Sequence, residues 1–212
     1  MIFVVDAGNR KHFATDLAAM HRQRKAVFVD RAGWKVPVVG DQEVDRYDLL
    51  ADTMYLLAKD EPSGQVLASV RLITTTGPHL MQDLYPPSIR ETLPSGPRVW
   101  EASRYCTAAG IAGRSKRLRL LWEIICGLME TALEYSIDKV IFAANRALLP
   151  LALECGWAAR PIGPTLIDGN DDMTPVVATI TEADLRTVRY RHNILEAIAR
   201  LPTSARQDGL RK

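Results

Sequence analysis

The sequence predicts an α/β fold in which a mixed β-sheet lies between helices on both of its faces. Early in the chain, two strand-like segments at 54–58 and 65–75 are separated by the turn sequence EPSG. Later, the clearest helix, 118–136, is followed by the wholly apolar strand 140–144. Strands that pair early and then alternate with helices are typical of a mixed sheet covered on both sides.

The N-terminal half is predicted to contain strands, one helix and an irregular stretch. Residues 2–5 (IFVV) predict a short buried strand, and residues 10–28 predict a helix. The apolar residues of this helix recur near the helical repeat, at Phe13, Leu17, Met20 and Val27. From 29 to 47 the periodicity fails among glycines, a proline and acids, which is typical of a working loop. Residues 98–108 (RVWEASRYCTA) predict a further central strand.

The C-terminal half alternates helices and strands. The apolar residues of the long helix fall on one face, away from its glutamates. A helix through LLPLALECG should end at Gly156, residues 176–180 (VVATI) predict a strand, and residues 182–200 predict a basic amphipathic helix. We expect one domain over residues 1–201 and a flexible tail over 202–212.

Composition excludes several classes of protein. The net charge of +2 gives no overall electrostatic case for nucleic-acid binding. The three cysteines lack a C-x-x-C spacing and indicate reduced thiols, and the four histidines show no ligand spacing, so we expect no metal site and a surface or capping role for each histidine. The apolar start is too short for a signal peptide and no stretch approaches a transmembrane span, which predicts a cytoplasmic protein without a membrane partner.

Charged and aromatic residues interrupt the predicted elements in a recognisable order. In chain order they are Arg24, Phe28, Trp34, Asp45, Asp48, Arg71, Glu101 and Arg104. A charge inside an apolar strand must face solvent, a cleft or a partner. If these groups converge, the three arginines balance the three carboxylates. A buried salt-bridge network without a chemical role is the alternative that spacing alone leaves open.

This set of residues resembles the signature of the acyl-homoserine-lactone synthase family, all eight positions matching in order. The strings RKAVFVDRAGWKV, DQEVDRYD, ASVRL and VWEASRYC are also typical of it, and the resemblance covers about residues 10–160. It implies a three-layer α/β/α sandwich similar to the GNAT-type N-acetyltransferases, with a mixed, splayed central sheet whose cleft takes the pantetheine arm of the acyl donor.

The spacing of Glu101 and Arg104 gives this resemblance a geometric test. They are an odd number of residues apart, so in an unbroken strand they would point to opposite faces. A β-bulge between them would re-aim one side chain. The related acetyltransferases carry such a bulge, so the resemblance predicts one near residues 101–104.

The resemblance implies an acyltransferase that makes a bacterial quorum-sensing signal. The amine of S-adenosylmethionine attacks an acyl thioester, and the substrate carboxylate then closes on its own γ-carbon, releasing 5′-methylthioadenosine. S-adenosylmethionine and an acyl-coenzyme A or acyl-carrier protein are substrates, and no cofactor or metal is needed. A general base typically contributes ~10²–10⁴-fold to such a proton transfer, and Glu101 is the leading candidate.

The remaining residues receive expected roles from the same resemblance. The catalytic set is Glu101, Arg104, Asp45, Asp48 and Arg71. The substrate-binding set is Arg24, Phe28, Trp34, Trp100, Ser103, Phe142, Ala143 and Ala144. Within it, Trp34 is expected to lie against the sulfonium, and the alanines stand where relatives that prefer 3-oxo acyl groups carry a Thr, which favours an unsubstituted, branched or aromatic chain. Arg24 and Arg104 would bind the substrate carboxylate or hold the N-terminal loop by bidentate pairing.

The segment GIAGRSKRLR precedes the long helix and is predicted to dock the acyl donor. Glycines before a helix N-terminus expose N–H groups that suit anions. The basic residues that could meet a phosphopantetheine, a pyrophosphate or an acidic carrier protein are Arg114, Lys116, Arg117 and Arg119. A solvated basic surface is the alternative, and the sequence does not separate the two donors.

Two other functions remain open at this point. A GNAT-type acetyltransferase acting on another amine would explain the fold and the basic segment, but not Trp34, Asp45 and Asp48. A catalytically silent ligand-binding protein is the second, and intact Glu101 and Arg104 argue against it.

Overall fold

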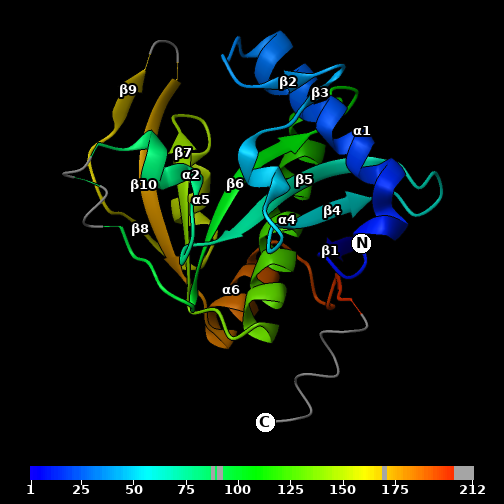
Figure 1. Ribbon diagram of the computed structural model, residues 1–212. Coiled ribbons are helices and arrows are strands. Elements are labelled where there is room, and N and C mark those ends of the chain that lie inside the picture. The colour runs from blue at the N-terminus through cyan, green and yellow to red at the C-terminus, as the bar shows by residue number, and fades with distance from the viewer. Residues whose placement is uncertain (87–88, 90–92, 169–170, 203–212) are drawn as a thin grey trace.

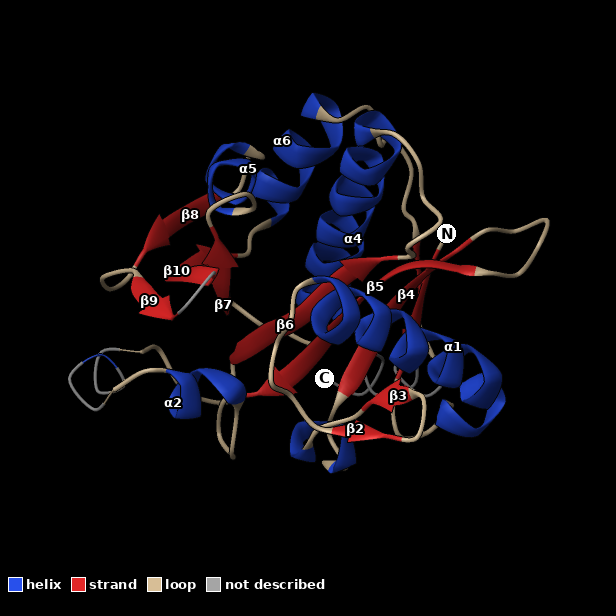
Figure 2. Cartoon of the chain, turned by 90° about the horizontal axis from the view of Figure 1, so that it is seen from above, coloured by secondary structure: helices blue, strands red, loops and turns tan. Residues whose placement is uncertain are grey.

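The computed structural model describes residues 1–86, 89, 93–168 and 171–202, and the described residues form a large mixed sheet between two layers of helices, with a separate two-stranded sheet (Figures 1 and 2). The sheet has nine strands in the order β11–β1–β4–β5–β6–β7–β10–β8, with β9 on β10. The strands are β1 (Ile2–Val5), β4 (Met54–Lys59), β5 (Val66–Thr74), β6 (Val99–Thr107), β7 (Lys139–Asn145), β8 (Ala158–Pro161), β9 (Leu166–Asp168), β10 (Asp171–Thr179) and β11 (Ala199–Arg200).

The centre of the sheet is splayed, as predicted. Strands β6 and β7 run parallel and pair over three residues of each, 99–101 with 139–141. Beyond that point their Cα pairing stops, and the two strands diverge (Figure 1). The β6 residues that follow therefore pair with β5 alone.

One face of the sheet is covered by α4 (Arg114–Glu134), α5 (Leu149–Glu154) and α6 (Glu182–Arg191), and the other by α1 (Ala14–Arg24) and α2 (Leu80–Leu84) (Figure 2). The apolar stripe of α4 packs on alternate residues of the strands, including Leu56, Val70, Leu72 and Trp100. On the opposite face two smaller cores lie under α1 and α2. The three-layer α/β/α prediction is confirmed.

Helix α4 begins four residues earlier than the apolar pattern indicates. Its N-cap is Gly113, whose positive φ of 84° is readily adopted by glycine. The first turn, from Arg114 to Arg117, is exposed and carries no apolar stripe, so hydrophobic periodicity could not detect it. Further along, Gly127 lies against Ile2, where an added Cβ would come within 2.8 Å of the isoleucine side chain.

Two helix predictions were wrong in extent. The segment 10–28 consists of a 3₁₀ turn (Arg10–Phe13), α1, and a π-helical segment (Lys25–Arg31). The C-terminal helix ends at Arg191 and not at 200, because Asn193 turns the chain with a φ of 53°.

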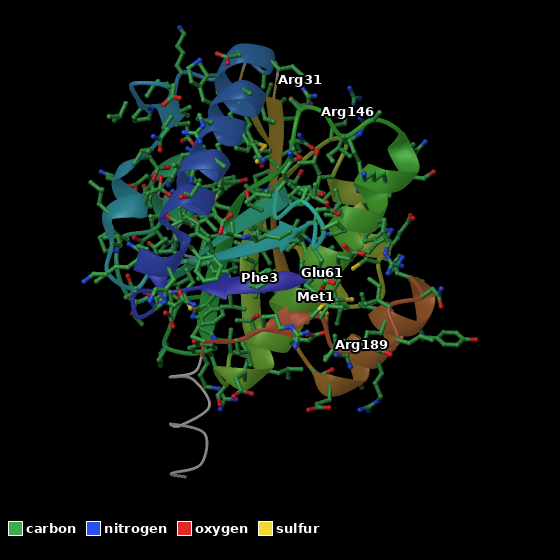
Figure 3. The ribbon with its side chains drawn as sticks, turned by 90° about the vertical axis from the view of Figure 1, so that its right-hand side faces the viewer. Met1, Phe3, Arg31, Glu61, Arg146 and Arg189 are labelled. Atoms are coloured by element: carbon green, nitrogen blue, oxygen red, sulfur yellow. The ribbon has the colours of Figure 1, made fainter. Side chains whose placement is uncertain are left out.

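After α6 the chain returns to the sheet and β11 pairs with β1. The Glu130 carboxylate of α4 accepts hydrogen bonds from the backbone N–H groups of Ile198 and Ala199 and from Arg189, labelled in Figure 3. These bonds attach the C-terminal segment to α4. Residues 203–212 of the predicted tail lie outside the described part of the chain. Among the described helices, each is too short or too polar to cross a lipid bilayer.

Candidate functional site

Arg24, the last residue of α1, is the buried centre of an ion-pair network. Its Nε donates to Glu43 Oε2 at 2.5 Å, and its Nη1 and Nη2 donate to the two carboxylate oxygens of Asp48 at 2.8 and 2.9 Å. The arginine side chain is 1% exposed. The predicted bidentate pairing of an arginine is thus made by Arg24 with Asp48, on the segment that follows the first helix.

The acids of the irregular stretch are fixed by the backbone of a short 3₁₀ helix, η3 (Arg46–Leu49). Asp45 is its N-cap and accepts from the N–H of Tyr47 at 2.9 Å. Asp48 reaches back and accepts from the N–H of Asp45 at 2.8 Å. This reciprocal capping fixes both carboxylates through backbone N–H groups, independently of their contacts with arginines.

Arg71 on β5 enters the same network from the sheet. Its Nη1 lies 2.5 Å from Asp45 Oδ1 and 3.0 Å from Asp48 Oδ1, and its Nε donates to Ser103 Oγ at 3.1 Å. Its Nη2 is buried without a hydrogen-bond partner in the described part of the chain. Arg71 therefore braces the acids and keeps one donor uncommitted among the described residues.

Arg104 on β6 completes the network, through Nε to Glu43 Oε1 at 3.2 Å and Nη2 to Asp45 Oδ2 at 3.1 Å. The balance of three arginines against three carboxylates is found, but Glu43 takes the place expected for Glu101. Sequence reasoning missed Glu43, which lies on the two-residue strand β3 (Gln42–Glu43) of a hairpin with β2 (Val38–Val39). The arginine–carboxylate cluster comprises Arg24, Glu43, Asp45, Asp48, Arg71 and Arg104.

Charge pairing outweighs burial at Asp48 and Arg24, whereas burial outweighs it at Arg104. Burial by itself disfavours an ionised carboxyl, yet hydrogen bonds and the charges of Arg24 and Arg71 hold the pKa of Asp48 well below its ordinary 3.8. Burial likewise opposes the charge of Arg24, but Asp48 and Glu43 raise its pKa. Burial lowers the pKa of Arg104 from 12.5, although an arginine stays protonated at physiological pH. The Asp48 carboxylate and the guanidinium groups of Arg24 and Arg104 are therefore charged at neutral pH.

The predicted β-bulge is present and lies at Arg104. Between Ser69 and Arg71, one residue of β5 faces two of β6, Arg104 and Tyr105, and Arg104 has a positive φ of 57°. Arg71 pairs with Ser103, while Ile73 pairs with Glu101, so these residues share one face of the sheet. Because the bulge turns Arg104 toward the same face, Glu101 and Arg104 lie on the α1 and α2 side together.

Glu101 is fully buried and is held by the segment that begins α2. His79 Nδ1 lies 2.9 Å from Glu101 Oε2, and the backbone N–H of Met81 donates to the same oxygen at 2.7 Å. The other oxygen, Oε1, is buried and has no hydrogen-bond partner among the described residues. The structure thus places Glu101 on the face of the cluster but in a separate hydrogen-bonded group.

The aromatic residues of the predicted site form a stack beside Arg104. The rings of Phe28 and Trp34 are parallel within 16° with centroids 4.8 Å apart. The Arg104 guanidinium lies 5.7 and 5.8 Å from their centroids. The π-helical segment after α1 makes this possible, because the N–H of Trp34 donates to the carbonyl of Phe28.

The predicted acyl-contacting residues divide between the two faces of the sheet. Trp100, Phe142 and Ala144 pack into the core under α4 and are buried. Trp100 lies against Tyr135 with ring centroids 5.5 Å apart. Ala143 points to the opposite face, toward the core under α2.

The basic residues of the predicted donor-docking segment lie at the start of α4 and are all exposed. Arg117 donates to the carbonyl of Ile111, inside the loop. Lys116 lines a pocket of about 680 Å³ between α1 and the turn joining β4 to β5. Arg119 instead pairs with Glu123 and donates to the carbonyls of His192 and Asn193, so it is directed toward the end of α6.

The expectation for the histidines was wrong at two positions. His79 and His21 are buried and bond within the site, His79 to the carboxylate of Glu101 and His21 by donating to the carbonyl of Glu43. Cys106 is buried on β6, and burial raises the pKa of its thiol to about 11. Among the described residues, His, Cys, Asp and Glu form no group of three that could hold a metal ion.

Known proteins are similar to this chain in sequence and in fold. A family model described as autoinducer synthase matches residues 9–188. An acyl-homoserine-lactone synthase of Ralstonia nicotianae is 30% identical over 189 residues, which cover 86% of this chain and 89% of that protein. One from Pseudomonas aeruginosa is 36% identical over 154 residues, covering 71% and 73%.

Solved structures agree with these matches. A CoA-dependent acyl-homoserine lactone synthase, BjaI, solved with SAM and isopentyl-CoA, is 26% identical and has a TM-score of 0.83, covering 100% of this chain and 99% of that one. An acyl-CoA N-acyltransferase from Pseudomonas aeruginosa, 19% identical with a TM-score of 0.54 over 84% of this chain and 98% of its own, shares the fold. The match over residues 9–188 spans the cluster, Glu101 and the aromatic stack, and the chain belongs to the autoinducer synthase family.

Proposed function

We propose that the chain acylates the amine of S-adenosylmethionine from an acyl thioester and then lactonises the product, releasing 5′-methylthioadenosine. Its family makes it an acyltransferase and an acyl-homoserine-lactone synthase. The observation that carries this function is the family match, because it spans all eight residues of the signature.

In the first step, the neutral amine attacks the thioester carbon, the thiolate departs, and the nitrogen loses a proton. Glu101 is the base, acting directly or through a water. This role is supported by Oε1, a buried acceptor without a partner in the described chain, on the sheet face that also carries Ser103 and Arg104. A buried acceptor of this kind is costly unless a ligand or water satisfies it.

In the second step, the substrate carboxylate attacks its own γ-carbon and the sulfonium leaves as a neutral thioether. No proton transfer is needed, so orientation supplies most of the acceleration. The free Nη2 of Arg71 is a donor suited to hold that carboxylate. The stacked rings of Phe28 and Trp34 would line the S-adenosylmethionine pocket, where the sulfonium can lie against an aromatic face.

The acyl donor is proposed to be a thioester of coenzyme A. The resemblance to the CoA-dependent BjaI over the whole chain supports this donor. The pantetheine arm would enter where β6 and β7 diverge, with its phosphates near the N-terminus of α4 and Lys116 and Arg117. Trp100, Phe142 and Ala144 would contact the acyl chain on the α4 face.

The test is to supply purified protein with S-adenosylmethionine and a series of acyl-CoA thioesters, with acyl-carrier protein as the alternative donor. We expect free thiol, 5′-methylthioadenosine and an acyl-homoserine lactone in equal amounts, identified by mass spectrometry. Thiol release without 5′-methylthioadenosine, in a parallel reaction that contains a second primary amine, would instead indicate an acetyltransferase of another amine. No turnover with any donor would favour a ligand-binding protein.

A further inference from the structure

His79 holds the carboxylate of Glu101 by one oxygen only. We propose that His79 is a positioning residue for acyl transfer, which fixes the Glu101 carboxylate so that Oε1 is directed at the attacking amine. This inference rests on the proposed function, in which Glu101 accepts the proton of that amine. It concerns a residue outside the eight-residue signature.

The geometry separates the two oxygens of the carboxylate. Both neighbouring donors, His79 Nδ1 and the N–H of Met81, bond Oε2, at 2.9 and 2.7 Å. Two donors on one oxygen fix the rotation of the carboxylate about its terminal bond. An ionised carboxylate offers about four acceptor sites, yet Oε1 is buried with no hydrogen-bond partner in the described chain. The second oxygen is therefore held in place without being used.

The strands on either side of Glu101 cannot take over this role. Its partners across the sheet are Ile73 on β5 and Ile141 on β7, whose side chains have no polar atoms. The charged groups of this face, Arg71 and Arg104, bond Asp45 and other members of the cluster. His79 is thus the one side chain that bonds Glu101 among the described residues.

The segment carrying His79 is itself attached to the cluster. Asp83 of α2 accepts hydrogen bonds from the hydroxyl of Tyr47 and from Arg46, both on η3. Segment 79–84 therefore bridges β6 and η3, with His79 at one end and Asp83 near the other. Through this bridge, hydrogen bonds link the position of Glu101 to that of the arginine–carboxylate cluster.

The test compares His79→Asn with His79→Ala. The amide nitrogen of asparagine lies close to where Nδ1 stands and keeps a donor, whereas alanine removes it. The readout is the rate of thiol release at saturating acyl-CoA and S-adenosylmethionine, with the Kd of S-adenosylmethionine measured by calorimetry. We expect the alanine variant to lose on the order of 10²-fold in kcat with its Kd within about threefold, and the asparagine variant to recover most of the rate.

Equal losses in both variants, or an unchanged kcat in His79→Ala, would overturn the proposal. If the alanine variant does not fold, His79→Gln replaces it. The glutamine amide is displaced by one methylene from the position of the histidine nitrogen, so we expect thiol release by this variant to remain slow. Thiol release without 5′-methylthioadenosine from the wild type would contradict the proposed function, while the His79 comparison is still decided by the thiol rates.

Discussion

The two groups of buried charges in this site differ in how many of their hydrogen-bonding atoms are used. In the arginine–carboxylate cluster, three positive and three negative groups from α1, β3, η3, β5 and β6 bond one another, and Arg71 Nη2 is the buried atom left over. In the Glu101 group, a single carboxylate takes two donors on one oxygen, and its other oxygen has no hydrogen-bond partner within the described ranges of the chain. In the function that we propose, the cluster holds the shape of the site and Glu101 performs its chemistry.

The largest expected effect on stability comes from breaking the cluster. Asp48→Asn would leave Arg24 buried without its bidentate partner, and loss of one member of a buried pair costs about 3–5 kcal/mol. Urea unfolding measures this cost. The matched control is Asp138→Asn, which removes the exposed pair with Arg98 and should change the unfolding free energy by about 0–1 kcal/mol. Equal losses of unfolding free energy in the two variants would show that the cluster contributes no more to stability than the exposed ion pair does.

The unfolding free energy at low pH provides a second test of how much Asp48 contributes to stability. The pKa of Asp48 is lower in the folded chain than its ordinary 3.8, so the folded state binds fewer protons there. Its contribution to stability is therefore complete above 3.8 and is lost as the pH falls toward the folded-state pKa. Unfolding free energies measured from about pH 5 to about pH 1 should fall steeply for the wild type once the pH drops below 3.8. The slope should be shallower for Asp48→Asn, and an unchanged slope would contradict the assignment.

The cluster and the fold were not equally visible in the sequence. Apolar runs identified β4, β5, β6 and β7 because buried strands need continuous or alternating hydrophobic residues. The odd spacing of Glu101 and Arg104, with the family resemblance, correctly located the bulge. Helix α4 was found by its stripe, but its polar first turn was not.

The missed residues share a physical cause. Glu43 belongs to a two-residue strand in a hairpin, which is too short to show a period. His79 meets Glu101 from 22 positions away, and such a contact leaves no local pattern. The C-terminal helix was predicted to extend too far, because an asparagine in the sequence does not by itself mark the end of a helix. The left-handed backbone conformation of Asn193 is visible only in the structure. Tertiary pairing decided each of these cases.

A smaller effect is expected at the aromatic stack. Trp34→Leu removes the ring that stacks on Phe28 and lies over Arg104, while keeping an apolar side chain. A cation–π contact is worth about 0.5–2 kcal/mol, so we expect the Kd of S-adenosylmethionine to rise by roughly two- to thirtyfold. Isothermal titration calorimetry provides the measurement, with Trp122→Leu as the control, because Trp122 lies on α4 and stacks on His192 at the end of α6. If the affinity for S-adenosylmethionine falls equally in both variants, the S-adenosylmethionine pocket does not lie at the aromatic stack.

The smallest effect is expected at Cys106, which lies beside the bulge on β6. Burial raises the pKa of its thiol to about 11, so the thiol stays protonated at neutral pH and gains reactivity only as the pH rises toward that value. Iodoacetamide at about pH 7.5 should leave Cys106 unmodified and the rate unchanged, as followed by mass spectrometry of the intact protein. Rapid modification accompanied by loss of activity would give the thiol a role that the structure does not assign.

The division of labour is tested most directly by one matched pair of substitutions, Glu43→Gln and Glu101→Gln. Both glutamates are fully buried and both changes are isosteric. Single-turnover thiol release per folded molecule should fall ~10²–10⁴-fold in Glu101→Gln with little change in unfolding free energy. In Glu43→Gln the unfolding free energy should fall instead, while the rate per folded molecule stays within about tenfold. A Glu101→Gln variant that turns over at the wild-type rate would contradict the account.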